Sequence, residues 1–570
     1  MAITGPAVGT LVVFFISIIF VIYPVSFHVS LPYLGRRRLS INLTTAPIIA
    51  ILVLWAAQCL GPKVIRDGIV GTDGVKPYNI LILFFSLAYM AITLDITGVL
   101  QAAAFWVSNK GGNNGYKLYL YFYIMLTVLS VFLGNDPVIL SGTAFLVYYT
   151  KVSELDPTSW LMSEFAAANT ASMVLFVGNP TNVVICEGFG INNAGFTGYT
   201  ILPFLGCIVF CFIALAIQFR KQKYIPRVLH NEGDLDVRSV LLDPIGAWVG
   251  SIILGSCLIV IIVVSFVHVD VWIISLPFAG AKFIYDIAWD HYRYVKKIPM
   301  RGQARSDEDL GQAEDDVIME QLRRHVSPHH EGQQPATGVE TSDKASGVET
   351  RVNTRNNTAE TGETYVADPT PTTSIEKKAG SDAEGTLLRR LNRLYVEKRH
   401  RFAAHFPTFY TALPRLPFAL VPFAFSQFIL IEALAHQGWI DVFARWLVIA
   451  SSKQIYPTIW LIGVLGVILC NVSGTNIGAT ILLTKIVRAA DMPVPTARAA
   501  AIALAVASNI GAVSFTFSAS LAGLLWRQIL EQKGIHVRQR TFAYWNAFPL
   551  VVMTAVGLGI VCAEMAVLYR

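Results

Sequence analysis

The chain has 570 residues, of which 54% are apolar and 14% are charged, and its mean hydropathy is +0.53. Charged residues make up roughly a quarter of an ordinary soluble protein, so this composition excludes an ordinary soluble protein. The charges are also unevenly placed, because residues 291–400 hold 17 basic and 18 acidic side chains. The formal net charge of +6 comes from short basic clusters between apolar runs, a pattern of membrane topology and not of a nucleic-acid-binding surface. The sequence therefore describes a membrane protein with one large water-exposed insert.

An α-helix needs about 20 mostly apolar residues to cross lipid. The apolar segments of the chain are residues 11–29, 46–60, 79–107, 118–133, 160–177, 201–219, 247–267, 271–288, 416–435, 440–450, 459–470, 480–487, 499–517 and 542–565. Several of them are too short to span, and broken helices persist in lipid only where protein or a water-filled cavity satisfies their backbone. We therefore predict an all-α polytopic protein with about 11–13 membrane segments, some of which are half-helices and hairpins.

Basic residues flank the first span and both ends of the insert. They are Arg36, Arg37 and Arg38 after the first span, Arg293, Lys296, Lys297 and Arg301 at the start of the insert, and Lys398, Arg399 and Arg401 at its end. Short basic flanks mark the cytoplasmic side, so we expect a cytoplasmic insert, an external amino terminus and a first span that is retained. The insert between residues 301 and 387 is polar and nearly free of aromatic side chains, which predicts disorder.

Two polar-in-apolar patterns recur on either side of the insert. The first half reads Gly-Asn-Asp-Pro at residues 134–137, Ala-Asn-Thr-Ala-Ser at 168–172 and Gly-Asn-Pro-Thr-Asn at 178–182. The second half reads Asn-Val-Ser-Gly-Thr-Asn at 471–476, Ser-Asn-Ile-Gly at 508–511 and a hydroxyl-rich stretch at 514–520. Asn135 and Asn169 are 34 residues apart, and Asn476 and Asn509 are 33 apart. We expect an extra helix and basic loop at 1–45, one repeat at 46–290, the insert at 291–405 and a second repeat at 406–570.

Secondary transporters hold their cargo near the bilayer midplane between two repeats that contain interrupted helices. Gly, Pro and Asn break the helices, and the freed amides and carboxamides can hold a hydrophilic solute or an ion. The predicted substrate or ion site consists of Asn135, Asp136, Asn169, Thr170, Ser172, Asn179, Thr181, Asn182, Asn471, Thr475, Asn476, Thr480, Ser508, Asn509, Ser514 and Ser518. A sodium site is predicted at Asn135, Asn169, Asn476 and Asn509, with Asp136 as the proton or cation partner.

Each motif also has a purely structural interpretation. The first could be a Pro-kinked helix end, the Asn-Pro motif a turn, and the small and hydroxyl residues of the second half a helix-packing face. Alternation of hydroxyls at Ser514, Thr516, Ser518 and Ser520 favours an extended, unwound stretch. Other ionisable residues in or near apolar runs are interpreted as interfacial side chains, namely Asp95, Glu164, Glu187, Glu432, Lys485 and Glu564.

At these motifs the sequence resembles the ion transporter superfamily, in its arsenite permease and citrate transporter-like branch. The resemblance includes Ser-Ala-Ser-Leu-Ala-Gly-Leu-Leu-Trp at residues 518–526, and it covers about residues 79–219 and 416–570. It implies two inverted repeats with re-entrant hairpins and discontinuous helices, an elevator motion of the hairpin-bearing part against a scaffold, and a homodimer. The second half lacks the carboxylate-binding Ser-Asn-Thr motif of dicarboxylate carriers, which leaves the substrate open.

The leading hypothesis is a secondary active transporter of a small anion or arsenite-like oxyacid, coupled to protons or sodium. A sodium/proton antiporter is the alternative, and a channel or a membrane-embedded enzyme is a more distant one. The sequence has no Gly-x4-Gly-Lys-Ser/Thr phosphate loop, and we expect neither an enzyme activity nor a cofactor. The expected partners are the solute, the coupling ion and the bilayer, without nucleic acid, and the expected location is the plasma membrane.

Overall fold

The computed structural model describes residues 4–31, 35–72, 74–229, 235–264, 269–298 and 397–569. The predicted disorder between residues 301 and 387 falls outside these residues. The chain divides into two units, Met1–Ser327 with His405–Arg570, and Pro328–Ala404. The described residues of the second unit, 397–404, are helical. Everything below concerns the first unit.

The first half contains a series of helices that begins with one long buried helix. The series is α4 (Pro77–Ile96), α5 (Val99–Gly111), α6 (Gly115–Leu133), α7 (Asn135–Val152), α8 (Pro157–Ala171), the short 3-10 helix η1 (Phe176–Gly178), α9 (Pro180–Phe189) and α10 (Asn193–Gln218).

The second half repeats this series element by element. It consists of α16 (Leu420–His436), α17 (Trp439–Ser451), α18 (Ile455–Val472), α19 (Asn476–Ala489), α20 (Val494–Ile510), the 3-10 helices η3 (Gly511–Val513) and η4 (Phe517–Ala519), α21 (Leu521–Gln532) and α22 (Gln539–Leu568). In both halves an unwound stretch with a 3-10 turn separates two helices, which are α8 and α9 in the first half and α20 and α21 in the second.

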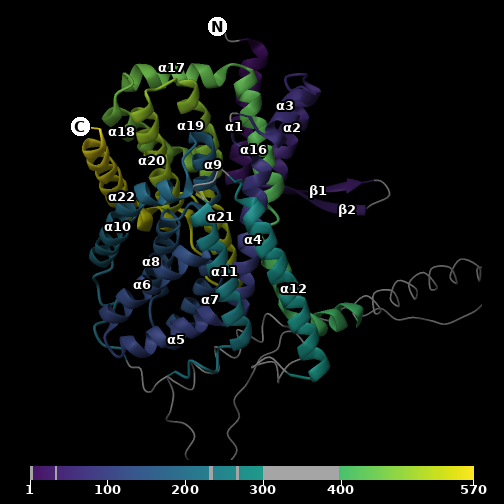
Figure 1. Ribbon diagram of the computed structural model, residues 1–570, viewed down its shortest axis with the longest axis vertical. Coiled ribbons are helices and arrows are strands. Elements are labelled where there is room, and N and C mark those ends of the chain that lie inside the picture. Colours follow the sequence, from purple (N-terminus) through teal and green to yellow (C-terminus); the bar gives the residue numbers. More distant parts are fainter. Residues whose placement is uncertain are drawn as a thin grey trace, which may run out of the picture. The chain divides into compact units, whose positions relative to one another are not determined.

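Equivalent residues of the two halves lie 340 or 341 positions apart. Gly98 and Gly438 precede α5 and α17 with φ of 87° and 79°, a left-handed conformation that suits glycine. Asn135 and Asn476 open α7 and α19, and Asn169 and Asn509 lie near the ends of α8 and α20. In Figure 1, α5 lies across one end of the first unit and its equivalent α17 across the other.

The prediction that residues 79–107 form one continuous segment is wrong. The chain turns at Gly98 between α4 and α5, although apolar residues predominate on both sides of the turn. A Cβ atom at Gly98 would lie 2.1 Å from the carbonyl oxygen of Val240, so no larger residue fits there. Glycine sets the break because of this close approach and its left-handed φ.

The amino-terminal segment also differs from the prediction. Helix α1 covers Gly5–Ile22, and the predicted span 11–29 continues into strand β1 (Val25–Leu31). This strand pairs with β2 (Gly35–Ile41) in an antiparallel hairpin, so the expected basic loop forms a strand that contains Arg36, Arg37 and Arg38. Pro24 lies between the helix and the strand, and because it has no backbone N–H and disfavours a helical conformation of the residue before it, the helix does not continue.

The remaining helices flank the long helix of the opposite half. Helices α2 (Thr45–Ala56) and α3 (Pro62–Val70) precede α4 in the chain but pack against α16. Helices α11 (Pro244–Val264), α12 (Trp272–Lys296) and α15 (Pro407–Arg415) precede α16 but pack against α4. We call α1–α4, α11, α12, α15 and α16 the scaffold, and α6–α10 with α18–α22 the hairpin unit. Helices α5 and α17 connect the two.

Nine helical segments in the described residues are long and apolar enough to cross a membrane. They are 5–22, 77–96, 115–133, 193–218, 244–264, 407–436, 455–472, 494–513 and 539–568. The predicted 11–13 segments also count shorter helices such as α2 and α8, which cannot span lipid alone. The fold is thus an all-α polytopic membrane protein whose two halves share one series of continuous and interrupted helices.

Candidate functional site

The two unwound stretches meet in the centre of the hairpin unit. Asn169 and Asn509, at equivalent positions of α8 and α20, are both fully buried. Each carboxamide nitrogen donates to the backbone carbonyl four residues earlier, that of Phe165 or Ala505, at 2.8 Å in both cases. This shared bond orients the two side chains in the same way. Their remaining donors and acceptors are therefore left for contacts between segments.

Asn509 joins the second half to the first. Its Oδ1 accepts a hydrogen bond from Ser172 Oγ at 2.8 Å, and its Nδ2 donates to Asn182 Oδ1 at 2.8 Å. Asn182 in turn donates to the carbonyl oxygens of Ser172 and Leu175, at 2.8 and 2.9 Å. These bonds close the unwound stretch between α8 and α9 around a side chain of the other half.

The residues that open α7 and α19 complete this network. Asn135 Nδ2 donates to Asn169 Oδ1 at 3.2 Å, and Asn476 Nδ2 donates to the carbonyl of Ser508 at 3.2 Å. Ser508 Oγ lies 3.3 Å from Thr181 Oγ1, which gives a second link between the halves. We call these residues the amide cluster, and its members are Asn135, Asn169, Ser172, Thr181, Asn182, Asn476, Ser508 and Asn509.

The other predicted residues lie at the helix ends around the amide cluster. Asn179 and Thr475 cap α9 and α19, accepting from the backbone nitrogens of Thr181 and Gly478. Asn471 Oδ1 accepts from both Ser514 Oγ and Thr516 Oγ1 at 3.0 Å. These contacts fix the helix ends next to the cluster.

Three predicted hydroxyls bond elsewhere. Thr480 donates to the carbonyl of Asn476, and Ser518 to the hydroxyl of Thr516. Thr170 faces away from the cluster, toward the sulfur of Met553 at 3.3 Å on α22. Thr170 thus lies outside the amide cluster, because the residue after Asn169 points to a different face of α8.

The hydroxyl-rich stretch between α20 and α21 is unwound, but it is not one extended strand. Residues 517–519 form a 3-10 turn, so the alternation of hydroxyls does not place them on one side. Ser520 instead caps α21, and Ser514 and Ser518 are buried. Asp136 lies in the first turn of α7, is partly exposed and has no recorded ion pair within the described residues.

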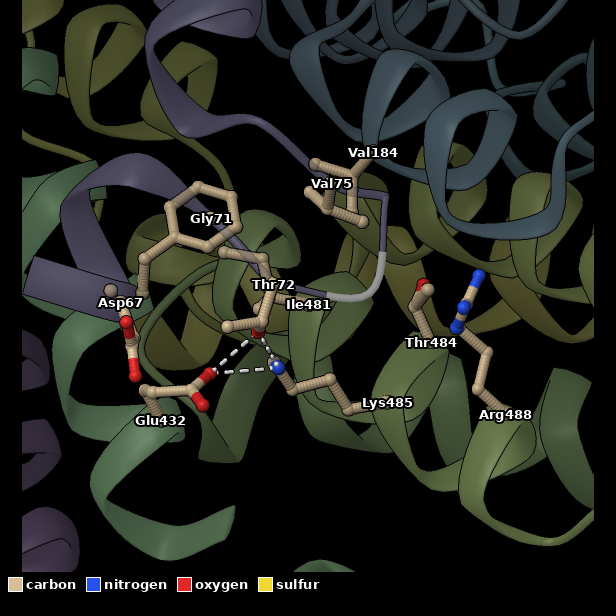
Figure 2. A pocket seen from close by; sticks show the side chains of 12 residues that line it. Asp67, Gly71, Thr72, Val75, Val184, Glu432, Ile481, Thr484, Lys485 and Arg488 are labelled. Carbon is tan, nitrogen blue, oxygen red and sulfur yellow. Dashed lines mark hydrogen bonds and ion pairs between the residues drawn. The ribbon is translucent and has the colours of Figure 1, made fainter. Parts of the chain in front are cut away.

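A charged crevice lies between the scaffold and the hairpin unit. It has a volume of about 10 Å³, the space of one water molecule. Figure 2 shows Lys485 of α19 reaching toward both Glu432 of α16 and Thr72 of the loop after α3. Lys485 Nζ lies 2.8 Å from both Glu432 Oε2 and Thr72 Oγ1, and Thr72 Oγ1 donates to Glu432 Oε2 at 3.0 Å. Glu432 and Lys485 thus form a mostly buried ion pair, and the prediction that they are interfacial was wrong.

Glu164 was also misplaced by the sequence prediction. It lies in the middle of α8 and is 0% exposed, and both carboxylate oxygens lie 3.0 Å from Thr143 Oγ1 on α7. Asp95 is buried as well, accepting from Ser141 Oγ and lying 3.6 Å from Arg415. A signal in the sequence was the position of Glu164 inside an alanine-rich segment, five residues before Asn169.

No group of three or more His, Cys, Asp and Glu side chains that could hold a metal ion occurs among the residues that the structure describes. The predicted sodium ligands are neutral amides. Two of them, Asn135 and Asn169, contact each other directly, whereas Asn476 contacts the backbone next to Asn509.

These halves, with interrupted helices that meet at a buried polar cluster, define a polytopic membrane transporter. Residues 5–291, just over half of the chain, match the family model described as Citrate transporter (CitMHS). The chain therefore belongs to the citrate transporter family, within the ion transporter superfamily that was expected from its motifs.

Curated relatives match shorter parts of the chain. An Escherichia coli arsenical pump membrane protein is 27% identical over 147 residues, 25% of this chain and 34% of the relative. The Homo sapiens P protein is 23% identical over 151 residues, 26% of this chain and 18% of the relative. The chain thus spans about a third or less of the length of these two proteins.

The Alcanivorax borkumensis YdaH transporter aligns over 99% of both chains, with a TM-score of 0.33 and 8% identity. These values are too low to support a comparison of details.

Proposed function

We propose that this protein is a secondary active transporter of a small anion or arsenite-like oxyacid, coupled to protons or sodium. The observation that carries the proposal is the amide cluster, in which Asn509 of one half bonds to Ser172 and Asn182 of the other. A site shared by two repeats at interrupted helices can be opened to either side of the membrane. The cluster has donors and acceptors but no formal charge, which suits a cargo that must be both held and released.

The proposed motion is of the elevator type. The hairpin unit contains the whole amide cluster, whereas the scaffold is built around α4 and α16. Helices α5 and α17 each connect the scaffold to the hairpin unit, and each begins after a glycine, Gly98 or Gly438, where the backbone turns sharply; the segment between α10 and α11 is a further connection. A hairpin unit that slides against the scaffold would carry its cargo from one side to the other.

The names of the family and of the relatives supply two test solutes, citrate and arsenite. The four asparagines Asn135, Asn169, Asn476 and Asn509 are the proposed ligands of a coupling sodium ion, because carbonyl oxygens suit hard cations. Asp136 is the alternative carrier of a coupling charge. We further propose a homodimer in the plasma membrane.

Replacement of both Asn169 and Asn509 with alanine tests this function. We expect the double variant to insert normally but to lose the uptake of citrate or arsenite into proteoliposomes, because each replacement removes contacts that join interrupted helices. Asn113→Ala, an exposed asparagine before α6, is the matched control and retains uptake. Unchanged transport by the double variant would contradict the proposed site.

The antiporter alternative makes a different prediction. If Asp136 carries an exchanged charge, a sodium gradient moves protons without any anion present. Proteoliposomes with a pH-sensitive dye inside distinguish the two functions, because the proposed transporter moves protons only when citrate or arsenite is added.

A further inference from the structure

Glu164 is a buried acid that the amide cluster does not use. It is 0% exposed in the middle of α8, a helix with protein on every side, and lies five residues, about 7.5 Å along the axis, before Asn169. Its two carboxylate oxygens each lie 3.0 Å from the hydroxyl of Thr143, and the side chain of Trp526 also contacts the carboxylate. Within the described residues no ion pair is recorded for it.

The surroundings of Glu164 are apolar and aromatic. The ring of the adjacent Phe165 lies 5.3 Å from those of both Trp526 and Phe542. A Cβ atom at Gly142 would lie 2.6 Å from Glu164 Oε1, so the α7 backbone is close on the other side. A carboxylate without a cation is unfavourable in such a place, whereas a neutral carboxyl is tolerated.

Ionisable side chains on the packed helices do not neutralise this acid. Lys117 on α6 and Lys151 on α7 are exposed, Arg527 on α21 pairs with Glu531, and Arg498 on α20 bonds to Tyr569. The other titratable groups on these helices are one acid, tyrosines and cysteines, namely Asp136, Tyr148 and Tyr149 on α7, Tyr116, Tyr119, Tyr121 and Tyr123 on α6, and Tyr199, Cys207 and Cys211 on α10. Tyr123 Oη donates to the carbonyl of Ile208, and Asp136 is about two helical turns from Thr143.

A cavity approaches Glu164 from the end of the hairpin unit. Its volume is about 390 Å³, enough for several water molecules, and it is open to solvent. Trp526 and Leu161 form part of its wall, and Leu161 is one helical turn before Glu164 on α8. His536 and Arg538 are the ionisable groups on the cavity wall. Water in this cavity can therefore come close to Glu164, and the side chain of Trp526 separates the two.

We propose that Glu164 is the proton-binding site through which cargo movement is coupled to a pH gradient. The inference rests on the proposed transport function and names its coupling ion. A proton from water adds to one carboxylate oxygen, and the neutral carboxyl returns it to water on the other side. Thr143 serves both states, because its hydroxyl donates to the carboxylate and its oxygen accepts from the carboxyl. No other reactant is needed.

Glu164→Gln separates coupling from cargo binding, because glutamine has the shape of the neutral carboxyl but cannot release a proton. In proteoliposomes with clamped membrane potential, one proton per solute gives wild type a concentration ratio of about tenfold per pH unit. We expect E164Q to equalise citrate or arsenite across the membrane at any pH gradient, while the exchange of labelled for unlabelled solute continues. Glu564→Gln, at another acid in an apolar helix, keeps wild-type coupling.

The outcomes are distinct. A pH-driven gradient in E164Q overturns the proposal, and so does loss of exchange together with coupling, which would indicate a structural role. If wild type exchanges neither solute, the proposed function fails with these solutes. Infrared difference spectra between acid and alkaline buffer then test Glu164 without cargo. We expect a protonated-carboxyl band in wild type that is missing in E164Q, and an identical band in both proteins overturns the proposal.

Discussion

Lys485 lies where three segments meet, and its ammonium group is only slightly exposed. The side chain is 11% exposed and that of Glu432 is 16%, so the pair has lost most of its water. Removing one partner of such a pair leaves a charge that is neither hydrated nor neutralised, whereas removing both leaves none. Each partner of the pair therefore matters mainly because it neutralises the buried charge of the other.

Lys485→Met should lower the stability of the purified protein by about 3 kcal/mol, because it leaves Glu432 without its cation. The double variant with Glu432→Met should recover most of this loss. Thermal unfolding in detergent measures both, with Arg527→Met as a control at an exposed ion pair, where a change below about 1 kcal/mol is expected. If the double variant is less stable than Lys485→Met, the pair does not act in this way.

Individual residues of the candidate site were predictable where the sequence repeats. Asn135, Asn169, Asn476 and Asn509 were recognised because their spacing recurs and because Gly or Pro stands nearby. Glu164 was not recognised, because the predicted segment began at residue 160 and the acid seemed to lie at its end. Helix α8 in fact begins at Pro157, so Glu164 lies in its middle. The helix is enclosed by segments that are distant in the sequence, and the sequence alone does not show these contacts.

At the scale of elements, the break between α4 and α5 depends on one glycine. Gly98 combines a left-handed φ with a Cβ position only 2.1 Å from the carbonyl of Val240. Composition alone does not place this break, since apolar residues predominate on both sides of it between residues 79 and 107. The turn could be found only through its recurrence at Gly438.

Gly98→Ala should therefore destabilise the protein by more than about 2 kcal/mol, because the left-handed strain alone costs about 1–2 kcal/mol. Gly559→Ala is the control, since this helical position has no atom within 4 Å of an added Cβ. That change should be neutral or stabilising by up to about 1 kcal/mol. Chemical or thermal unfolding compares the two, and equal stabilities would refute the role given to Gly98.

At the scale of the whole molecule, two of the polar contacts between the scaffold and the hairpin unit join their helices directly. Asp95 of α4 bonds to Ser141 of α7, and Glu432 of α16 pairs with Lys485 of α19. Each contact joins the long scaffold helix of one half to the hairpin helix of the same half. A sliding motion has to break or remake at least one of them.

A bridge across the first contact should stop transport. In a variant without native cysteines, Asp95→Cys with Ser141→Cys can be linked by Hg²⁺, and we expect solute exchange to cease reversibly on adding thiol. The control link lies inside the hairpin unit, between retained Cys207 of α10 and Gly557→Cys of α22, where an added Cβ lies 2.8 Å from the Cys207 sulfur. That link should leave exchange intact, and exchange through the first bridge would exclude the sliding motion.

The two connecting helices α5 and α17 lie across opposite ends of the molecule, each hinged at a glycine. If the hairpin unit slides as proposed, two helices that hold it at opposite ends would act as a four-bar linkage. The unit would then move along one direction and resist tilting, because a tilt would stretch one helix while compressing the other. Such a mounting would deliver the cargo to both membrane faces in a single orientation.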